Sequence, residues 1–194
     1  MTECTFAHAT PDRWPDIEAL FSPCAEARRC WCAFWYRPKH EFLAGRGEGN
    51  RRFLEQMIAC DRSPGIIAYR DGAPAGWCGV APRQGQVRLA ASRTLAPVDD
   101  APVWSITCFV IGKTHRRQGL MRPLIEAAVT HAAAHGATVV EAYPIDPQRK
   151  LASGEIHTGL VSAFRDLGFQ EVARRSPLRP IMRRALRPRA EQAK

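Results

Sequence analysis

The segment from Cys108 to Met121 constrains the fold of this chain more than any other. It reads CFVIGKTHRRQGLM, so an apolar run passes into a short basic loop and then into a long segment rich in Ala and Leu. The apolar run predicts a buried strand over 103–111. The residues that follow favour a helix over 118–135, which ends at Gly136. A strand, a loop and a helix in this order at the centre of a chain predict a mixed α and β fold.

The remaining elements are expected from hydrophobic periodicity and turn residues. Thr10 and Pro11 are typical of a helix start, and Asp71-Gly72 is typical of a hairpin turn. The segment 84–100 shows no clear periodicity and is expected to be irregular. Strands are expected over 5–9, 65–69, 74–80, 138–145, 169–174 and 180–184, and helices over 11–21, 50–60 and 158–167.

The basic loop has the features of an anion site. The first N–H groups of a helix have no intrahelical acceptor, and the helix dipole adds positive charge there. Gly119 removes a Cβ where an anion must approach the backbone. The alternative is an ordinary strand-to-helix turn with a basic surface. The loop lacks the glycine patterns of nucleoside-triphosphate and dinucleotide sites. Cationic potential comes from Lys113, His115, Arg116, Arg117 and Arg122.

Positive charge is concentrated at the C-terminal end of the sequence. Residues 174–194 hold eight basic side chains against one acidic, and the whole chain has a formal charge of +9. Such a segment binds nucleic acid or stays solvated. No aromatic residue lies among the arginines as a stacking platform, which favours the solvated alternative. We therefore expect one domain over 1–184 and a basic tail over 185–194.

Cysteine content and hydropathy limit the class of protein. The seven cysteines are unevenly spaced and are expected to be free thiols. Cys24, Cys30 and Cys32, with His40 as a fourth ligand, match no common zinc spacing, so no metal is expected. No apolar run approaches the roughly 20 residues that span a bilayer, and the N-terminal residues lack the features of a signal peptide. The expectation is a cytoplasmic protein without a membrane partner.

Two motifs carry a resemblance to a known family. RRQGLM over 116–121 resembles motif A of the GNAT acetyltransferase superfamily, and AFRDLGF over 163–169 resembles its fourth helix and the following Gly-Phe. The Cys-Trp-Cys segment resembles a bacterial subgroup of that family. The resemblance implies an α/β (mixed α+β) fold with a mixed central sheet of six to seven strands and about four helices. Met121 departs from the usual small residue, and Phe164 replaces a tyrosine that commonly protonates the leaving thiolate.

The resemblance implies an enzyme that uses acetyl-CoA as co-substrate and transfers acetyl directly to an amine of a small molecule or peptide. The alternative is an acyl-CoA-binding or nucleic-acid-binding module that has lost its chemistry. The oligomeric state is not defined by the sequence, and a homodimer is one open alternative. The residues implied to bind the cofactor are Phe109, Val110, Ile111, Arg116, Arg117, Gln118, Gly119, Leu120, Met121, Arg122 and Phe164.

Catalytic candidates follow from the chemistry of the transfer. An alkylamine with a pKa near ~10.4 costs about 4.6 kcal/mol to deprotonate at pH 7, so a base is useful. Glu141 is the leading candidate base, and Tyr143, two residues on, shares its strand face and is a candidate acid. The alternatives are a carboxylate paired with an arginine and a packed tyrosine.

Acceptor-binding candidates come from aromatic residues near the N-terminus. Trp31, Trp35 and Tyr36 lie between the first two expected long helices, and this connection usually flanks the acceptor in the family. An aromatic wall favours an apolar or cationic acceptor. The alternative is a local core. His157, at the start of the fourth helix, completes the candidate set, with a solvent-exposed or capping histidine as its alternative.

Overall fold

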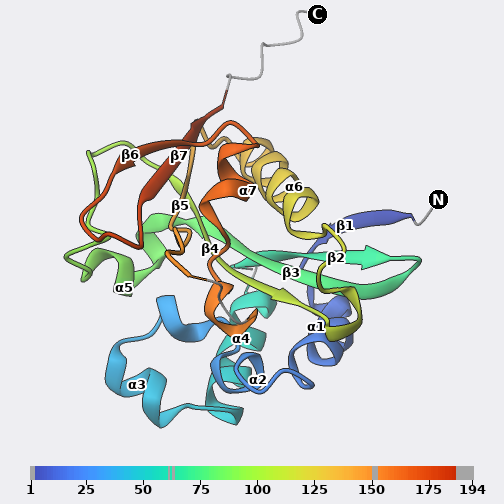
Figure 1. Ribbon diagram of the computed structural model, residues 1–194. Helices are drawn as coiled ribbons and strands as arrows, with labels where there is room; N and C mark the ends of the chain where they lie inside the picture. Colours follow the sequence, from blue (N-terminus) through green and yellow to red (C-terminus); the bar gives the residue numbers. More distant parts are fainter. Residues whose placement is uncertain (1–2, 61, 63, 150–152, 187–194) are drawn as a thin grey trace, which may run out of the picture.

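The computed structural model describes residues 3–60, 62, 64–149 and 153–186. Its centre is a seven-stranded sheet in the order β1-β2-β3-β4-β5-β7-β6 (Figure 1). Neighbouring strands are antiparallel except for β4 and β5, which are parallel. The strands are β1 Cys4–His8, β2 Gly65–Arg70, β3 Ala73–Pro82, β4 Trp104–Ile111, β5 Val139–Ala142, β6 Gln170–Ala173 and β7 Ile181–Ala185.

The parallel pair β4 and β5 determines where the site lies. The two strands pair only from Trp104 with Val140 to Ile106 with Ala142. Strand β4 then continues to Ile111, whereas β5 ends at Ala142. The carboxyl-terminal half of β4 therefore has a free edge, because no strand of the described residues pairs with it on that side.

Helices cover both faces of the sheet. Seven α-helices lie within the described residues, more than the four or so expected, because α2, α3 and α5 are short helices in segments that lack helical periodicity. Short 3-10 turns accompany them. The α-helices are α1 Trp14–Phe21, α2 Ala27–Cys30, α3 Lys39–Ala44, α4 Glu48–Ala59, α5 Val87–Ala90, α6 Met121–Ala134 and α7 Val161–Arg165.

Side-chain alternation along the strands builds two cores. Ile66 and Ala68 of β2 face α6, whose Leu124, Ile125 and Ala128 are fully buried. The intervening Ile67 and Tyr69 face α1 and α4 on the other side of the sheet. This is the period of two that a strand buried on both faces requires. Figure 1 shows α1 to α4 gathered together, with α6 and α7 packed elsewhere against the sheet.

The expected elements are confirmed with shifted ends. The helix expected over 118–135 begins at Met121, because the loop before it adopts positive φ at Arg117 and Gly119. The strand expected over 138–145 is shorter, and beyond it Ile145 forms only an isolated bridge to Leu160. The helix expected over 158–167 is α7. The segment 84–100 is mostly irregular as expected, apart from a 3-10 turn and α5.

Candidate functional site

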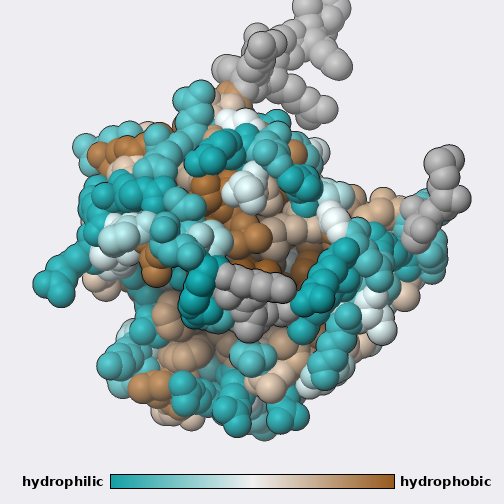
Figure 2. Space-filling view, viewed as in Figure 1, coloured by the Kyte–Doolittle hydropathy of each residue, from teal (hydrophilic) through white to brown (hydrophobic). Residues whose placement is uncertain are grey.

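A large cavity opens along the free edge of β4. Its volume is about 1850 Å³. It runs from the loop after β4, across the second half of that strand, to α3, α5 and the connection between β6 and β7. Figure 2 shows hydrophobic residues in a hollow on this face, with hydrophilic residues around it. A cavity of this size and length accommodates an extended ligand together with a second molecule.

The loop between β4 and α6 forms one end of the cavity. Arg117 has φ 59° and Gly119 has φ 77°, so left-handed residues alternate with right-handed or extended ones. Successive N–H groups in such a loop converge into a concave anion-binding nest, which the start of α6 continues. A Cβ at Gly119 would meet no protein atom within 4 Å, so the space above it is open. The loop therefore fits a pyrophosphate.

Side-chain hydrogen bonds hold this loop in place. Arg116 donates from Nε to the carbonyl of Ile111 at 3.1 Å, which ties the loop to the end of β4. Gln118 donates from Nε2 to the carbonyl of Thr114 at 2.7 Å and accepts a bond from Arg70. Gln118 thus supports the loop from outside and does not line the cavity, although we expected it to bind the cofactor directly.

The free edge of β4 is partly occupied by the protein itself. The N–H of Phe109 donates to the carbonyl of His157 at 2.6 Å. The N–H of Ile111 lies two residues on and faces the same edge, because strand polar groups alternate in direction. The sequence predicts that amides near Phe109 to Ile111 hold a ligand chain. In the structure, the first of these amides, that of Phe109, is already hydrogen-bonded to the His157 carbonyl.

Most of the residues expected at the cofactor site are brought together. Phe164 is an exception, because it is fully buried and packs edge-on against Phe109 and Phe169 at centroid distances of 6.2 and 5.0 Å. It closes the cavity from behind as part of the core. The expected residues that line the cavity are Phe109, Val110, Ile111, Arg116, Arg117, Gly119, Leu120, Met121 and Arg122.

Glu141 and Tyr143 lie outside the cavity lining, in a buried polar network. Arg83 donates to Oε1 of Glu141 at 2.8 Å and Arg183 donates to Oε2 at 2.7 Å. The Tyr143 hydroxyl donates to Oε1 at 2.5 Å, and it also contacts Ser105. Burial, together with the Glu141 charge, raises the pKa of Tyr143 far above its usual value. This placement favours the two structural alternatives over the catalytic hypotheses, since neither side chain reaches the cavity.

The aromatic segment divides between core and cavity. Trp31 and Cys32 have φ of 47° and 51°, two consecutive left-handed residues that reverse the chain. As a result Trp31 stacks in the core on Phe21 and Trp14 at 5.3 and 5.8 Å, whereas Trp35 lines the cavity. Trp35 donates from Nε1 to the carbonyl of Thr107 at 3.3 Å. Tyr36 lies behind it, outside the lining, and His157 lines the cavity as expected.

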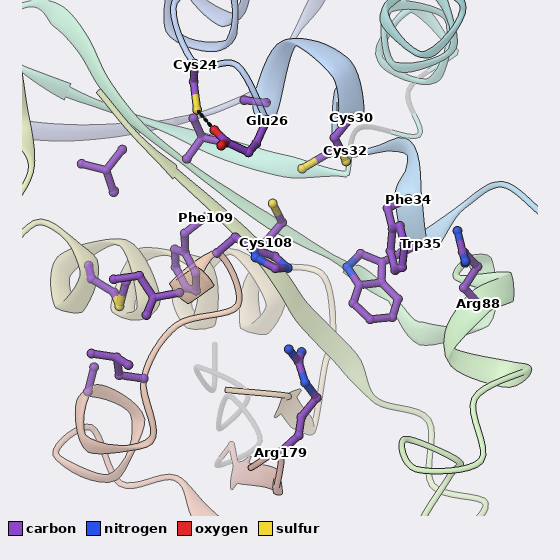
Figure 3. Close-up of a pocket in the computed structure, with 18 of the residues that line it drawn as sticks. Cys24, Glu26, Cys30, Cys32, Phe34, Trp35, Arg88, Cys108, Phe109 and Arg179 are labelled. Atoms are coloured by element: carbon purple, nitrogen blue, oxygen red, sulfur yellow. Dashed lines mark hydrogen bonds between the residues drawn. The ribbon is translucent and has the colours of Figure 1, made fainter. Parts of the chain in front are cut away.

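Four thiols also line the cavity (Figure 3). They belong to Cys24, Cys30, Cys32 and Cys108. Burial raises the pKa of Cys30 to about 12, and a hydrogen bond with Cys108 raises that of Cys32. These two thiols are therefore protonated at neutral pH and are poor nucleophiles. All seven cysteines are free thiols, as expected. Among the described residues, no group of three or more potential ligands is arranged to hold a metal ion.

Sequence reasoning missed several cavity residues. Glu26 is the only carboxylate among the described residues of the lining, and the Cys24 thiol donates to it at 3.5 Å (Figure 3). A backbone N–H, assisted by this thiol, lowers the pKa of Glu26, so the side chain is charged. Arg88 and Arg179 reach the cavity from α5 and from the connection between β6 and β7. Their elements carry no motif, so no local signal identified them.

The fold of this chain is similar to that of solved acetyltransferases. An acetyltransferase GNAT family structure from Streptococcus agalactiae superposes with a TM-score of 0.57 at 15% identity, covering 95% of this chain and 96% of that one. A PaiA N-acetyltransferase from Thermoplasma acidophilum in complex with coenzyme A gives 0.54 at 10% identity, with 95% and 99% covered. A ribosomal-protein-alanine N-acetyltransferase from Brucella melitensis gives 0.55 at 16%, with 94% and 99% covered.

The family follows from the sequence match. Residues 14–152, well over half of the chain, match the acetyltransferase (GNAT) family. The chain therefore belongs to this family. No curated protein matches it. Within the described ranges, no helix combines the length and apolar character needed to cross a membrane.

Proposed function

We propose that this protein is an N-acetyltransferase that transfers acetyl from acetyl-CoA directly to an amine. The observation that carries the proposal is the continuity of one cavity from the anion nest at Gly119, along the free edge of β4, to the wall formed by Trp35. Family membership supports acyl transfer. The cavity supports simultaneous binding of both substrates, which removes much of the entropic barrier to their reaction.

The residues present fit an acyl-CoA. The nest over 117–121 and the positive side chains of Arg116, Arg117 and Arg122 suit its phosphates, and the open space above Gly119 admits them. The amide of Ile111 suits the amide-rich arm, and the apolar side chains of Val110 and Leu120 flank it. When bound, the co-substrate supplies an activated acyl group as a thioester. This chain aligns the acceptor with that group and excludes water from between them.

Glu26 and His157 are the polar side chains that we assign to the acceptor amine. The charged carboxylate of Glu26 suits an ammonium group, which it would hold beside the middle of β4. Its lowered pKa makes it a weak base, so its role in this proposal is to orient the amine. Deprotonation is assisted by partial desolvation in a cavity walled by Trp35 and Phe109.

A binding module without turnover is the second candidate. One observation favours it: no tyrosine is among the described residues that line the cavity, and Phe164 is sealed in the core. If the protein is an enzyme, the CoA thiolate must leave without protonation by a tyrosine. A cytoplasmic location and small-molecule or peptide acceptors are further parts of the main proposal.

Titration calorimetry with acetyl-CoA, followed by thiol release with a panel of amines, tests the proposal. Micromolar binding and thiol release that depends on an amine are the expected results. Binding without release by any amine favours the module. Absence of binding overturns both candidates, since both require the nest to hold the co-substrate.

A further inference from the structure

The end of the cavity beside Trp35, which we call the acceptor end, carries an excess of positive charge. Four cationic side chains line this end and come from different elements, whereas Glu26, the only lining carboxylate within the described residues, lies near Cys24 and Arg116. These four are separate from the arginines of the loop after β4. They are Lys39 of α3, Arg46 after it, Arg88 of α5 and Arg179 before β7.

Within the described residues, these three arginines and one lysine lack the carboxylate partners that several other arginines have. Arg51, Arg83, Arg174 and Arg183 each form an ion pair with at least one carboxylate. No described carboxylate lies within 4.0 Å of any of the four cavity cations. Many surface arginines also lack a carboxylate, so the distinguishing feature is that these unpaired cations converge on one cavity, which marks a place for an external anion.

Arg179 shows the imbalance most clearly. Its guanidinium points into the cavity from the connection between β6 and β7 (Figure 3). Its side chain makes one hydrogen bond to the described residues, a long one from Nη1 to the Thr158 hydroxyl at 3.4 Å. Burial lowers the pKa of Arg179 below its ordinary value. A partly desolvated cation with no counter-ion is unfavourable, and an anionic ligand beside it relieves that cost.

Arg88 is held in position by aromatic rings. Its guanidinium carbon lies 3.9 Å from the centroid of Phe34 and 5.8 Å from that of Phe42. Stacking fixes the plane of a guanidinium and leaves its edge N–H groups available to a planar or tetrahedral anion. Lys39 and Arg46 are exposed at the rim, where they add attractive potential for such a ligand.

We infer that the acceptor is a small amine that also carries an anionic oxygen group, a carboxylate or a phosphate, which Arg179 and Arg88 bind while Glu26 holds the amine. In Figure 3, Glu26 and Arg179 lie on opposite sides of Cys108 and Phe109, so the two charged ends of such a molecule would lie across the middle of β4. The inference rests on the proposed acetyl transfer. It excludes polyamines and lysine-rich peptides as preferred acceptors, because their second cation would face Arg179.

Matched acceptors test the inference. The carboxylate pair is 5-aminopentanoate against pentylamine, with cadaverine as the dication, and the phosphate pair is O-phosphoethanolamine against ethanolamine. In the wild type, kcat/KM for at least one anionic member is expected to exceed that of its neutral match by about tenfold or more. The pair that shows the preference identifies the anion. Equal rates, or a preference for cadaverine, overturn the inference while leaving acetyl transfer intact.

Variants test the residue assignment. Arg179→Gln is expected to reduce the ratio of anionic to neutral kcat/KM by about tenfold. The matched control is Arg165→Gln, an exposed arginine of α7 that does not line the cavity, and its ratio should equal that of the wild type. If the ratio survives in folded Arg179→Gln, the assignment is wrong. Should no amine be turned over, calorimetry with the same pairs in the presence of CoA replaces the rates, and equal affinities overturn the inference.

Discussion

The Nε of Arg183 lies 2.7 Å from Oε2 of Glu141, and the two residues are register partners on β7 and β5. The second carboxylate oxygen pairs with Arg83 at 2.8 Å. Glu141 is fully buried, so its charge depends on these two arginines. Arg183 also pairs with Asp99 at 2.6 Å, and Arg83 donates to the carbonyl of Leu95 at 2.6 Å. The network therefore joins two strands to the irregular segment 84–100.

Replacing Glu141 with Gln should lower the free energy of unfolding by about 3–5 kcal/mol, because the largely buried Arg83 loses its carboxylate and Arg183 keeps only the half-exposed Asp99. Urea denaturation monitored by circular dichroism measures the loss. Glu126→Gln is the control, since its pair with Arg184 at 2.7 Å is partly exposed and should contribute about 1 kcal/mol or less. A Glu141→Gln protein that is as stable as the wild type but inactive would restore Glu141 as a catalytic base.

Gly119→Ala should weaken acetyl-CoA binding by about tenfold or more, because the new methyl group points into the open space where phosphates are expected. Gly136→Ala is a close control at the other end of α6. Its φ is 81° against 77° for Gly119, and its Cβ likewise meets nothing within 4 Å. Both variants should lose about 1 kcal/mol of stability from backbone strain. Calorimetry showing equal affinities in the two variants would contradict the nest.

Gly159→Ala should destabilise the protein by about 2 kcal/mol. Gly159 has φ 84°, and a Cβ there would lie 2.7 Å from a ring carbon of Phe164 and 3.2 Å from one of Phe109. Thermal unfolding measures the effect. Gly85→Ala, at an exposed position where a Cβ meets nothing, should stay within about 0.5 kcal/mol of the wild type. Similar losses in both variants would show that the ring packing behind the cavity is not as described.

Stability should fall as the pH drops from about 6.5 to about 4, in part through His131. Burial, with the nearby His135 and His8, lowers the pKa of His131 from 6.5 to about 4. The unfolded chain therefore binds more protons than the folded one in this window, and acid favours unfolding. Folded His131 sits 4.3 Å from His135 and 4.7 Å from His8 between ring centroids.

Comparison of variants isolates this contribution. Melting temperatures measured at pH 4 to 7 should fall less steeply in His131→Gln than in the wild type, because the titrating group is gone. His40→Gln should keep the wild-type slope, since that side chain is 84% exposed. Parallel curves for His131→Gln and the wild type would refute the role of His131.

The sequence predicted those parts of the fold that depend on residues close together in the chain. The Gly119 loop and the strand before it were identified because an anion nest needs residues that are close in the chain. Sequence reasoning did not reveal the buried network around Glu141 and Tyr143, since adjacency on a strand does not show that Arg83 and Arg183 converge on Glu141. Trp31 and Trp35 were grouped together, and only two consecutive positive φ angles separate them into core and cavity.

The acceptor end could not have been predicted in the same way. Lys39 of α3, Arg88 of α5 and Arg179 before β7 lie far apart in the sequence, and their segments carry no motif. What sets them apart is that they converge on one cavity without a carboxylate partner among the described residues, and that convergence exists only in three dimensions. An isolated basic residue is ordinarily solvated. The sequence therefore drew attention to the cluster of basic residues in the loop after β4 and not to these single residues.

The His157 carbonyl competes with any ligand for the N–H of Phe109, because the two groups are already hydrogen-bonded. Because it belongs to the same chain, its effective concentration is set by the geometry of the loop and does not fall on dilution. A ligand that uses the Phe109 amide exchanges one hydrogen bond for another and gains little there. In the proposed enzyme, affinity for acetyl-CoA would then come mainly from its phosphates at Gly119, and the strand edge would close again when the product leaves.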